Sequence, residues 1–342
     1  MKAVRLHRYA QAPIVEEIAD PKIAHPFDVI VKIGGAGLCR TDIHIIEGQW
    51  KEKSNVALPY TLGHENAGWV HAVGSAVENV AVGDTVIVHP LVTCGFCRAC
   101  RAGDDMHCEA SAFPGISTDG GFATFLKTSA RSVVKLDPSL QPKDIAALAD
   151  AGLTAYHAVK KAAAILHPGT TAVVIGAGGL GHIGVQCLRA MTPASIVVVD
   201  RSEAALALAK TLGADHTVLA DGTQIEKVRE LTNGFGAEAV IDFVGEGSAI
   251  ADGVAMLRRA GSYYVIGYGG TLNVPFIDII STEINFVGNL VGTYTDLAEL
   301  MTLTADGKVK LHTKTYPLDA FNESVDDLEH GRLQGRGILV PA

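Results

Sequence analysis

The chain has 342 residues, of which 48% are hydrophobic and 19% charged, and 28 basic against 37 acidic residues give a formal net charge of −9. At roughly 100–200 residues per domain this length predicts two or three domains, with a core large enough to need no disulfide staples. The acidic balance, without any run of lysine or arginine, argues against nucleic-acid or anionic-membrane binding. The N-terminus lacks a signal-like apolar core, and the longest charge-free stretch, 162–188, is broken by Pro168 and several glycines. We therefore expect no membrane span and a cytoplasmic protein.

Short alternating strands and glycine punctuation dominate the first 150 residues. Examples are 28–33, 67–73 and 85–89, each bounded by Gly, Pro or Asp. Such a pattern predicts an antiparallel, mostly β region with long functional loops.

From about residue 153 short apolar strands alternate with helical patterns. The expected strands are 172–175, 196–200, 216–219, 239–243 and 263–266, and the expected helices are 182–191, 203–212, 225–231 and 250–257. This alternation predicts an α/β domain with a parallel sheet covered on both faces. After about residue 287 the pattern breaks again, and the last 50 residues resemble neither half.

A glycine-rich turn links the first of these strands to its helix. The sequence there is Gly-Ala-Gly-Gly-Leu-Gly, a G-x-G-x-x-G pattern. Glycines in this context allow a tight turn, close approach to a pyrophosphate and close helix–strand packing, while the helix N-terminus faces the phosphates. An ordinary strand–helix turn is the alternative, and dinucleotide binding is the interpretation that the context favours. The residues assigned to it are Gly176, Gly178, Gly179, Leu180 and Gly181.

The next strand ends in Asp200, 19 residues beyond Gly181. A carboxylate at this place accepts hydrogen bonds from a ribose diol and repels a 2′-phosphate, which favours NAD over NADP. Arg201 follows immediately and opposes part of that preference.

Four cysteines crowd into 15 residues with the spacing C-x2-C-x2-C-x7-C: Cys94, Cys97, Cys100 and Cys108. Four thiolates in one loop can close a tetrahedral Zn²⁺ site that leaves no open position, which is typical of a structural zinc. Two disulfides are the alternative, and a reducing cytosol disfavours them.

A second set of metal-binding residue types is dispersed. Cys39, Asp42 and His44 fall within six residues, His64 and Glu65 begin a G-H-E pattern, and Asp150 closes the strand-rich half. Cys, His and a carboxylate are suitable ligands of a catalytic Zn²⁺ with an open position. Each residue also has an ordinary role open to it: a buried thiol, a core histidine, a helix cap.

Taken in order, these motifs resemble the zinc-dependent medium-chain alcohol dehydrogenases, and in particular bacterial secondary-alcohol dehydrogenases. The motifs are G-L-C-R-T-D at 37–42, G-H-E-x-x-G-x-V-x-x-V-G at 63–74, Gly-Asp at 83–84, the cysteine loop, D-A-G-L-T-A-Y-H at 150–157 and the glycine turn. The resemblance runs from Lys2 to Gly337. It implies a GroES-like β-rich catalytic domain over 1–152, a Rossmann domain over 153–288, and a return to the catalytic domain over 289–342.

The resemblance also implies roles for individual residues. Cys39, His64 and Asp150 would be the catalytic zinc ligands, giving two zinc ions per subunit. Glu65 would be a neighbour able to become a transient ligand, and Asp42 would hold the second ring nitrogen of His64.

The proton and cofactor contacts follow from the same resemblance. Thr41 would take the hydroxyl proton and pass it through the nicotinamide ribose to His44, although a surface histidine without a role is the alternative there. Arg40 and Arg336 would contact the cofactor pyrophosphate, and Thr154 would lie near the nicotinamide.

The predicted function is reversible, NAD-dependent oxidation of primary or secondary alcohols to aldehydes or ketones. A polyol dehydrogenase of the same fold and a catalytically silent NAD-binding or redox-sensing protein remain alternatives. The expected partner is a small alcohol or carbonyl substrate. We further expect a homotetramer, in which an apolar strand at 286–291 extends the sheet of one subunit into the next.

Overall fold

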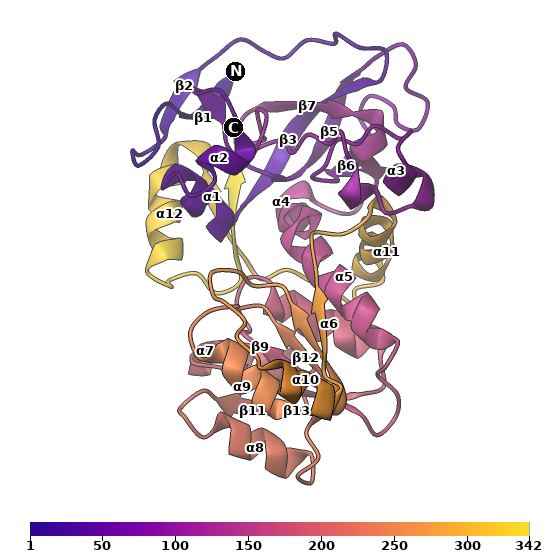
Figure 1. Ribbon diagram of the computed structural model, residues 1–342. Helices are drawn as coiled ribbons and strands as arrows, with labels where there is room; N and C mark the ends of the chain where they lie inside the picture. Colours follow the sequence, from indigo (N-terminus) through magenta and orange to yellow (C-terminus); the bar gives the residue numbers. More distant parts are fainter. Residues whose placement is uncertain (342) are drawn as a thin grey trace. The chain divides into compact units, whose positions relative to one another are not determined.

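The computed structural model describes residues 1–341, and their contacts divide the chain into two compact units. The split unit comprises Met1–Leu153 and the segment from Thr293 onward, whereas the central unit is continuous, Thr154–Gly292. The unit boundaries therefore lie one and four residues beyond those expected at 152 and 288. Figure 1 shows the C-terminal segment, drawn in yellow, returning to the unit that holds the N-terminus.

Two sheets build the split unit. The smaller has the order β2-β1-β4, and the larger has the order β15-β16-β3-β5-β6-β8, with β7 also paired to β3. All pairs are antiparallel except β15 with β16. The strands are β1 (Lys2–Leu6), β2 (Ile14–Glu17), β3 (Asp28–Leu38), β4 (Tyr60–Thr61), β5 (Glu65–Val73), β6 (Thr85–Val88), β7 (Phe125–Ser129), β8 (Val133–Lys135), β15 (Thr313–Pro317) and β16 (Arg336–Val340).

Helices of the split unit are mostly short. They are α1 (Arg40–Ile46), α2 (Lys51–Ser54), α3 (Arg98–Ala102), α4 (Pro142–Ile145), α11 (Tyr294–Ala305) and α12 (Phe321–Glu329), with 3₁₀ turns η1 (Asp105–His107), η2 (Ala130–Ser132), η3 (Ala146–Ala149) and η4 (Leu318–Ala320). Helix α5 (Ala151–Ala163) begins in the split unit and continues into the central unit.

Strand β3 lies in the interior of the larger sheet, where it pairs with β16, β5 and β7, and it is longer than predicted. It runs through three glycines to Leu38 instead of ending at Ile33. Glycine is required here by close approach: a Cβ on Gly37 would lie 2.1 Å from Oε2 of Glu65, and one on Gly35 would lie 2.7 Å from the Cα of Lys143. The strand therefore carries the chain directly to Cys39.

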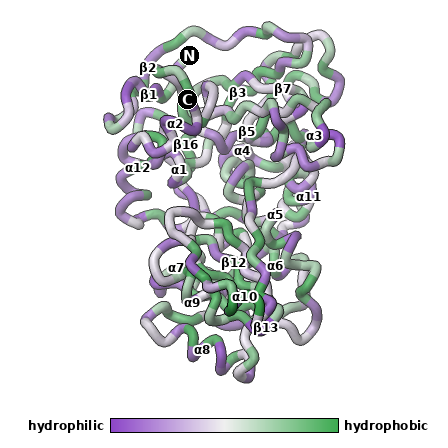
Figure 2. Tube along the Cα trace, viewed as in Figure 1, coloured by the Kyte–Doolittle hydropathy of each residue, from purple (hydrophilic) through white to green (hydrophobic). Residues whose placement is uncertain are grey.

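The central unit is a six-stranded parallel sheet of order β11-β10-β9-β12-β13-β14. Val173 of β9 lies in register with Val197 of β10 and Val240 of β12, and all three are buried. Figure 2 shows hydrophobic colours concentrated on these inner strands, as expected for strands covered on both faces. The elements are β9 (Thr171–Ile175), α6 (Gly181–Met191), β10 (Ser195–Asp200), α7 (Glu203–Thr211), β11 (His216–Leu219), α8 (Gln224–Leu231), β12 (Ala237–Asp242), α9 (Ala249–Met256), β13 (Leu257–Val265), α10 (Phe276–Thr282) and β14 (Asn285–Gly288).

Two predictions for this unit were wrong in their bounds. Strand β13 begins at Leu257, not at Tyr263, and a register shift between Ala237 and Ala239 accommodates its polar first half. The strand expected over 286–291 ends at Gly288, and Val291 has a positive φ of 47°, which does not fit an extended strand. Across residues 1–341 the structure contains no helix both long and apolar enough to cross a membrane.

Candidate functional site

The four clustered cysteines of the split unit converge as predicted from their spacing. Their sulfur atoms all lie within 4.8 Å of one another, and none forms a disulfide. Main-chain N–H groups point at the sulfurs: Cys94 N lies 3.3 Å from Sγ of Cys108, and Cys97 N lies 3.4 Å from Sγ of Cys94. Hydrogen bonds from the main chain of Cys100 and Glu109 lower the pKa of Cys97 to about 6. Burial raises the pKa of Cys100 to about 11, so the main-chain N–H groups favour the thiolate, the form that binds zinc, at Cys94 and Cys97.

A second cluster forms where β3 and η3 end and β5 begins. One donor atom each from Cys39, His64, Glu65 and Asp150 lies within 4.8 Å of the other three. Cys39 follows β3, His64 precedes β5, and Asp150 follows η3, so the strand and turn ends place them. His64 and Glu65 are fully buried, whereas the side chain of Asp150 is 15% exposed. A thiol, an imidazole and carboxylates in one buried group form a donor set suited to zinc.

The orientation of His64 supports a metal at this cluster. Its Nδ1 lies 3.2 Å from Oδ1 of Asp42, while its Nε2 faces Oδ2 of Asp150 at 3.4 Å. Both ring nitrogens are buried, and neither makes a hydrogen bond within residues 1–341. An imidazole with one nitrogen beside a carboxylate and the other unused among further donors is the arrangement of a metal ligand.

Asp42 is itself fixed by helix α1. The main-chain N–H of Cys39 donates to Oδ2 of Asp42 at 2.9 Å, which closes the start of the helix. Burial would lower the pKa of His64, but the charge of Asp42 and contacts to Asp150 and Cys39 raise it well above its ordinary value. The carboxylates therefore outweigh burial and favour positive charge at this point.

Glu65 and Arg336 form a buried ion pair beside this cluster. The guanidinium of Arg336 donates to Oε2 of Glu65, and Oε1 of Glu65 accepts from the main-chain N–H of Ala151 at 3.0 Å. Burial raises the pKa of Glu65, against the lowering effect of Arg336. We expected Arg336 at the cofactor pyrophosphate from its motif alone, and missed this partnership because nothing local to 335–337 points to residue 65. The structure gives the arginine a carboxylate partner within the split unit.

The predicted proton-transfer residues lie on α1. Thr41 and His44 are three positions apart and so are neighbours on the helix surface. The side chain of His44 is 17% exposed, with Nδ1 at 3.4 Å from Oε2 of Glu47. Arg40, the first residue of α1, is exposed.

An aromatic ring borders the second cluster. The ring of Phe113 meets that of His64 edge to face, with centroids 5.9 Å apart. Phe113 is partly buried against the core of the split unit, so it forms an apolar wall next to the donor set.

In the central unit the glycine turn joins β9 to α6, as predicted. Gly176 has a φ of +85°, and a Cβ on Gly181 would lie 1.7 Å from its carbonyl oxygen, so the protein itself requires these two glycines. Gly178 differs, because a Cβ there would have no heavy atom within 4 Å. This open space on the turn fits a pyrophosphate that approaches the backbone closely. Gly179 and Leu180 complete the turn before α6.

His182 supports this turn, a contact that the sequence analysis missed. The imidazole is fully buried, and its Nδ1 lies 2.8 Å from the carbonyl oxygen of Gly178. A histidine directly after the last glycine is the signal that could have found it.

Asp200 and Arg201 line a cavity of about 250 Å³ at the carboxyl ends of β9 and β10. Oδ2 of Asp200 accepts from the main-chain N–H of Ala177 at 2.6 Å, and Oδ1 accepts from that of Ser202 at 2.8 Å. These bonds fix the carboxylate next to the glycine turn, at the place where a ribose diol would follow a pyrophosphate. Thr154 lies on α5 and is partly exposed.

Comparison with known proteins agrees with this architecture. Residues 25–138 match the family model described as alcohol dehydrogenase GroES-like domain, and residues 179–306 match the one described as zinc-binding dehydrogenase. The NAD-dependent alcohol dehydrogenase of Sulfurisphaera tokodaii is 36% identical, with all of both chains covered. The D-arabinose 1-dehydrogenase (NADP(+)) of Saccharolobus solfataricus is 34% identical over 99% of this chain and 97% of its own.

Among solved structures, the alcohol dehydrogenase of Aeropyrum pernix superposes with a TM-score of 0.96 and 48% identity, with all of both chains covered. Full-length identity above 30% and both family models show that the chain combines a GroES-like domain with a Rossmann-type domain. The chain therefore belongs to the zinc-dependent, medium-chain alcohol dehydrogenases.

Proposed function

We propose that the protein uses NAD to oxidise primary or secondary alcohols reversibly to aldehydes or ketones, and that it holds two zinc ions. Cys39, His64 and Asp150 would hold the catalytic ion, and the four-cysteine loop would hold the structural one. The observation that carries the proposal is the buried Nε2 of His64, which has no hydrogen bond and faces a thiol and a carboxylate.

The two bound groups would supply complementary chemistry. A Zn²⁺ ion in this set would favour loss of the hydroxyl proton of an alcohol, as it lowers the pKa of water to about 7 at comparable sites. NAD would supply the hydride acceptor, and the protein supplies position and charge.

The remaining side chains act on the proton and on orientation. Thr41 accepts the hydroxyl proton of the alcohol while its own hydroxyl proton is passed on toward His44, and the partly exposed ring of His44 releases a proton to water. Asp42 holds the ring of His64, so that its Nε2 stays directed at the donor set. Phe113 shields one side of the cluster from water and favours apolar alcohols.

Asp200 supports a preference for NAD over NADP. A 2′-phosphate would meet a carboxylate already fixed by two main-chain N–H groups and unable to turn away without losing them. The nearby Arg201 opposes this effect in part. Asp200→Gly is expected to raise the kcat/KM for NADP relative to NAD, whereas equal efficiency of the unaltered enzyme with both would show that Arg201 outweighs Asp200.

Metal content per subunit, measured together with NADH production on a small panel of alcohols, tests the proposal. Two zinc ions with activity are expected. Cys39→Ser should lower the zinc content by one and abolish turnover, while NADH binding is retained. Cys187→Ser is the matched control, because Cys187 is also buried, lies on α6 and belongs to neither cluster. Near-normal activity of Cys39→Ser would show that the catalytic zinc is assigned wrongly.

A second candidate is a dehydrogenase of polyols or sugars. The similarity to a D-arabinose dehydrogenase and the carboxylate-rich donor set favour it. Turnover on sorbitol and D-arabinose, compared with 2-propanol and 1-phenylethanol, separates the two. NADH binding without turnover on any of these would instead indicate a silent binding protein.

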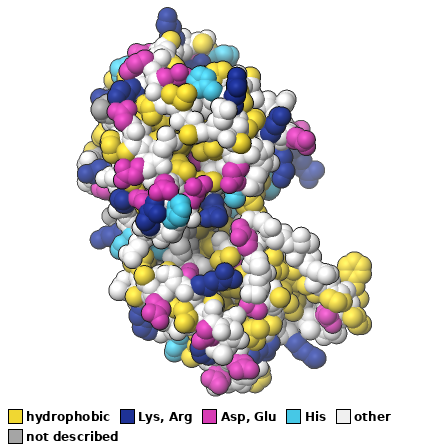
Figure 3. Space-filling view, turned by 90° about the vertical axis from the view of Figure 1, so that its left-hand side faces the viewer, with side chains coloured by type: hydrophobic (Ala, Val, Ile, Leu, Met, Phe, Trp, Pro, Cys, Tyr) yellow, Lys and Arg dark blue, Asp and Glu magenta, His cyan; other side chains and the backbone are white. Residues whose placement is uncertain are grey.

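The surface of the central unit supports self-association. Helix α10 exposes Phe276, Ile277 and Ile280 by 83%, 67% and 72%, and β14 is the free edge of the parallel sheet. Hydrophobic side chains project from one edge of this unit in Figure 3. Exposed apolar surface next to a free strand edge suits a second copy of the chain.

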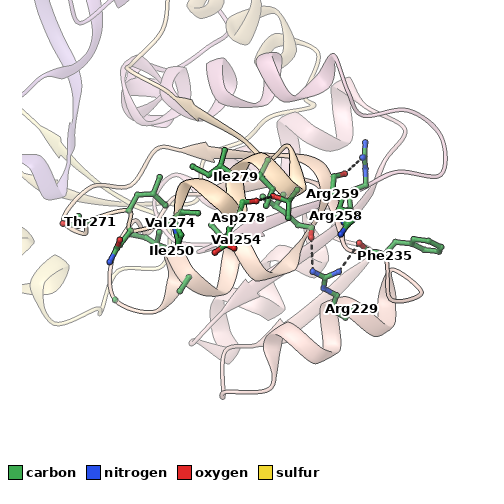
Figure 4. A pocket seen from close by; sticks show the side chains of 18 of the residues that line it. Arg229, Phe235, Ile250, Val254, Arg258, Arg259, Thr271, Val274, Asp278 and Ile279 are labelled. Carbon is green, nitrogen blue, oxygen red and sulfur yellow. Dashed lines mark hydrogen bonds between the residues drawn. The ribbon is translucent and has the colours of Figure 1, made fainter.

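A groove of about 930 Å³ lies beside α10 (Figure 4). Two of its arginines are already engaged: the guanidinium of Arg229 donates to the carbonyl oxygens of Ala255 and Leu257, and that of Arg258 donates to Glu238. Arg259 and Asp278, of opposite charge, also line the groove. The apolar remainder, including Ile250 and Ile279, suits a protein surface better than an anion. We expect a tetramer by analytical ultracentrifugation, and sedimentation at the mass of one chain would overturn this.

A further inference from the structure

The cavity that Asp200 borders contains a polar pair to which nothing so far gives a role. Gln224 begins α8, and Asp252 lies in the first turn of α9; both line this cavity of about 250 Å³. The volume is below the roughly 300–1,000 Å³ of sites for drug-sized ligands, so it suits one nucleoside and not a whole dinucleotide.

The order of groups in a dinucleotide, pyrophosphate then ribose then base, determines which group occupies this cavity. The glycine turn takes the pyrophosphate and Asp200 the ribose, so the base lies in the part of the cavity beyond Asp200. Apolar side chains of Val244 and Met256 line the cavity, together with Gln224 and Asp252. This step rests on the proposed dinucleotide function.

The polar pair is oriented by its own hydrogen bonds. Oε1 of Gln224 accepts from the main-chain N–H of Gly222 at 2.7 Å, and its Nε2 donates to Oδ2 of Asp252 at 2.8 Å. Gln224 is only 7% exposed, so the amide cannot turn over without leaving buried polar atoms unpaired.

This arrangement presents a fixed donor next to a fixed acceptor. Nε2 of Gln224 keeps its second hydrogen, and Oδ1 of Asp252 makes no hydrogen bond within residues 1–341. The Watson–Crick edge of adenine offers an amino donor next to a ring-nitrogen acceptor. Hypoxanthine and guanine offer a carbonyl acceptor next to an N–H donor, which is the reverse order.

We propose that Gln224 and Asp252 read the amino edge of the cofactor base and make the enzyme selective for adenine dinucleotides. Asp252 accepts from the exocyclic amino group, and Gln224 donates to the neighbouring ring nitrogen. With the ribose held at Asp200, a 6-oxo purine places its carbonyl oxygen against the carboxylate of Asp252.

Direct binding tests this without catalysis. Kd is measured by fluorescence titration for NADH and for its reduced hypoxanthine analogue, which differs only at the base. The unaltered protein should bind NADH at least about tenfold more tightly, the effect of one mispaired polar contact. In Asp252→Asn the amide of residue 252 accepts from Gln224 and turns an N–H toward the base, so the ratio should fall toward one or invert.

Two further variants distinguish the proposed base contacts from a general effect of removing a negative charge. Glu226→Gln removes the same charge from an exposed position of α8 that does not line the cavity, and should leave the ratio unchanged. Gln224→Leu keeps the charge of Asp252 but removes the oriented donor, and should also lower the ratio. Thermal unfolding midpoints verify that each variant is folded.

The outcomes distinguish the two hypotheses. If NADH binds but the unaltered protein has the same Kd for both dinucleotides, or if neither Asp252→Asn nor Gln224→Leu changes the ratio, the proposed base reading is wrong. If the unaltered protein binds neither dinucleotide, the proposed NAD function itself is wrong.

Discussion

One substitution in the glycine turn is expected to weaken cofactor binding without lowering the stability of the protein. A Cβ on Gly178 has no heavy atom within 4 Å, and Gly178 has no positive φ. Gly178→Ala should therefore leave the apoprotein as stable as before, or stabilise it by about 0.4–1 kcal/mol through the unfolded state. At roughly 2–4 °C per kcal/mol for a unit of this size, the Tm rises by at most about 4 °C.

The same methyl group occupies the space assigned to the pyrophosphate. Overpacking of this kind costs about 1–3 kcal/mol, which corresponds to a roughly 5- to 150-fold higher Kd for NADH. Fluorescence titration gives the Kd, and differential scanning calorimetry of the apoprotein gives the Tm.

Two other glycines provide the contrast. Gly181→Ala would place its Cβ 1.7 Å from the carbonyl oxygen of Gly176, so it should lower the Tm as well as the affinity. Gly288 at the end of β14 also has no heavy atom within 4 Å of a built Cβ, and Gly288→Ala should change neither quantity much. An unchanged Kd for Gly178→Ala would refute the assignment of this turn to the pyrophosphate.

Three further predictions concern the split unit. Asp150→Ala should lower kcat by more than about 100-fold and leave the Kd for NADH unchanged, because only the donor set is altered. Steady-state kinetics gives kcat and fluorescence titration gives the Kd; an unchanged kcat would contradict the role of Asp150. Arg336→Met leaves the carboxylate of Glu65 buried and unpaired, which costs about 3–5 kcal/mol in urea unfolding, and adding Glu65→Gln should recover much of the loss. Hydrogen bonding from Lys314 and neighbours holds the pKa of Asp327 below its ordinary value of 3.8, so its stabilisation is present above that pH and is lost as the pH falls. Asp327→Asn should therefore make the Tm less sensitive to pH below about 4, and identical acid titration curves of the Tm would contradict this.

Local pattern predicted the central unit well, because its strands and helices are short, periodic and joined in sequence. The start of β13 escaped prediction, since Arg258 and Arg259 read as a polar break and the strand is completed by pairing with β12. In the same way Gly35 and Gly37 read as a turn, whereas β3 continues through them so that Glu65 and α4 can approach.

The sequence predicted which residues belong to the candidate site, but not which residues contact them. Spacing alone brings Cys94 and Cys97 together, because they share one loop. The pairing of Glu65 with Arg336 joins residues 271 apart and depends on β16 lying next to β3. The periodicity of the sequence gives no sign of such a long-range contact. It likewise gives no sign of the hydrogen bond between Gln224 and Asp252, which lie on two different helices.

The placement of β16 also bears on how the protein is made. β16 lies between β15 and β3 in the larger sheet, and Arg336 follows the central unit in the chain, so it is synthesised after that unit. Until residues 336–340 have been synthesised, Glu65 lacks its cation and the 36–38 part of β3 lacks its partner strand β16. The continuous Rossmann-type unit has by then emerged entire, and domains of this kind fold as units during synthesis. The nascent chain thus acquires its central unit first, and the split unit is completed only after β16 has been synthesised.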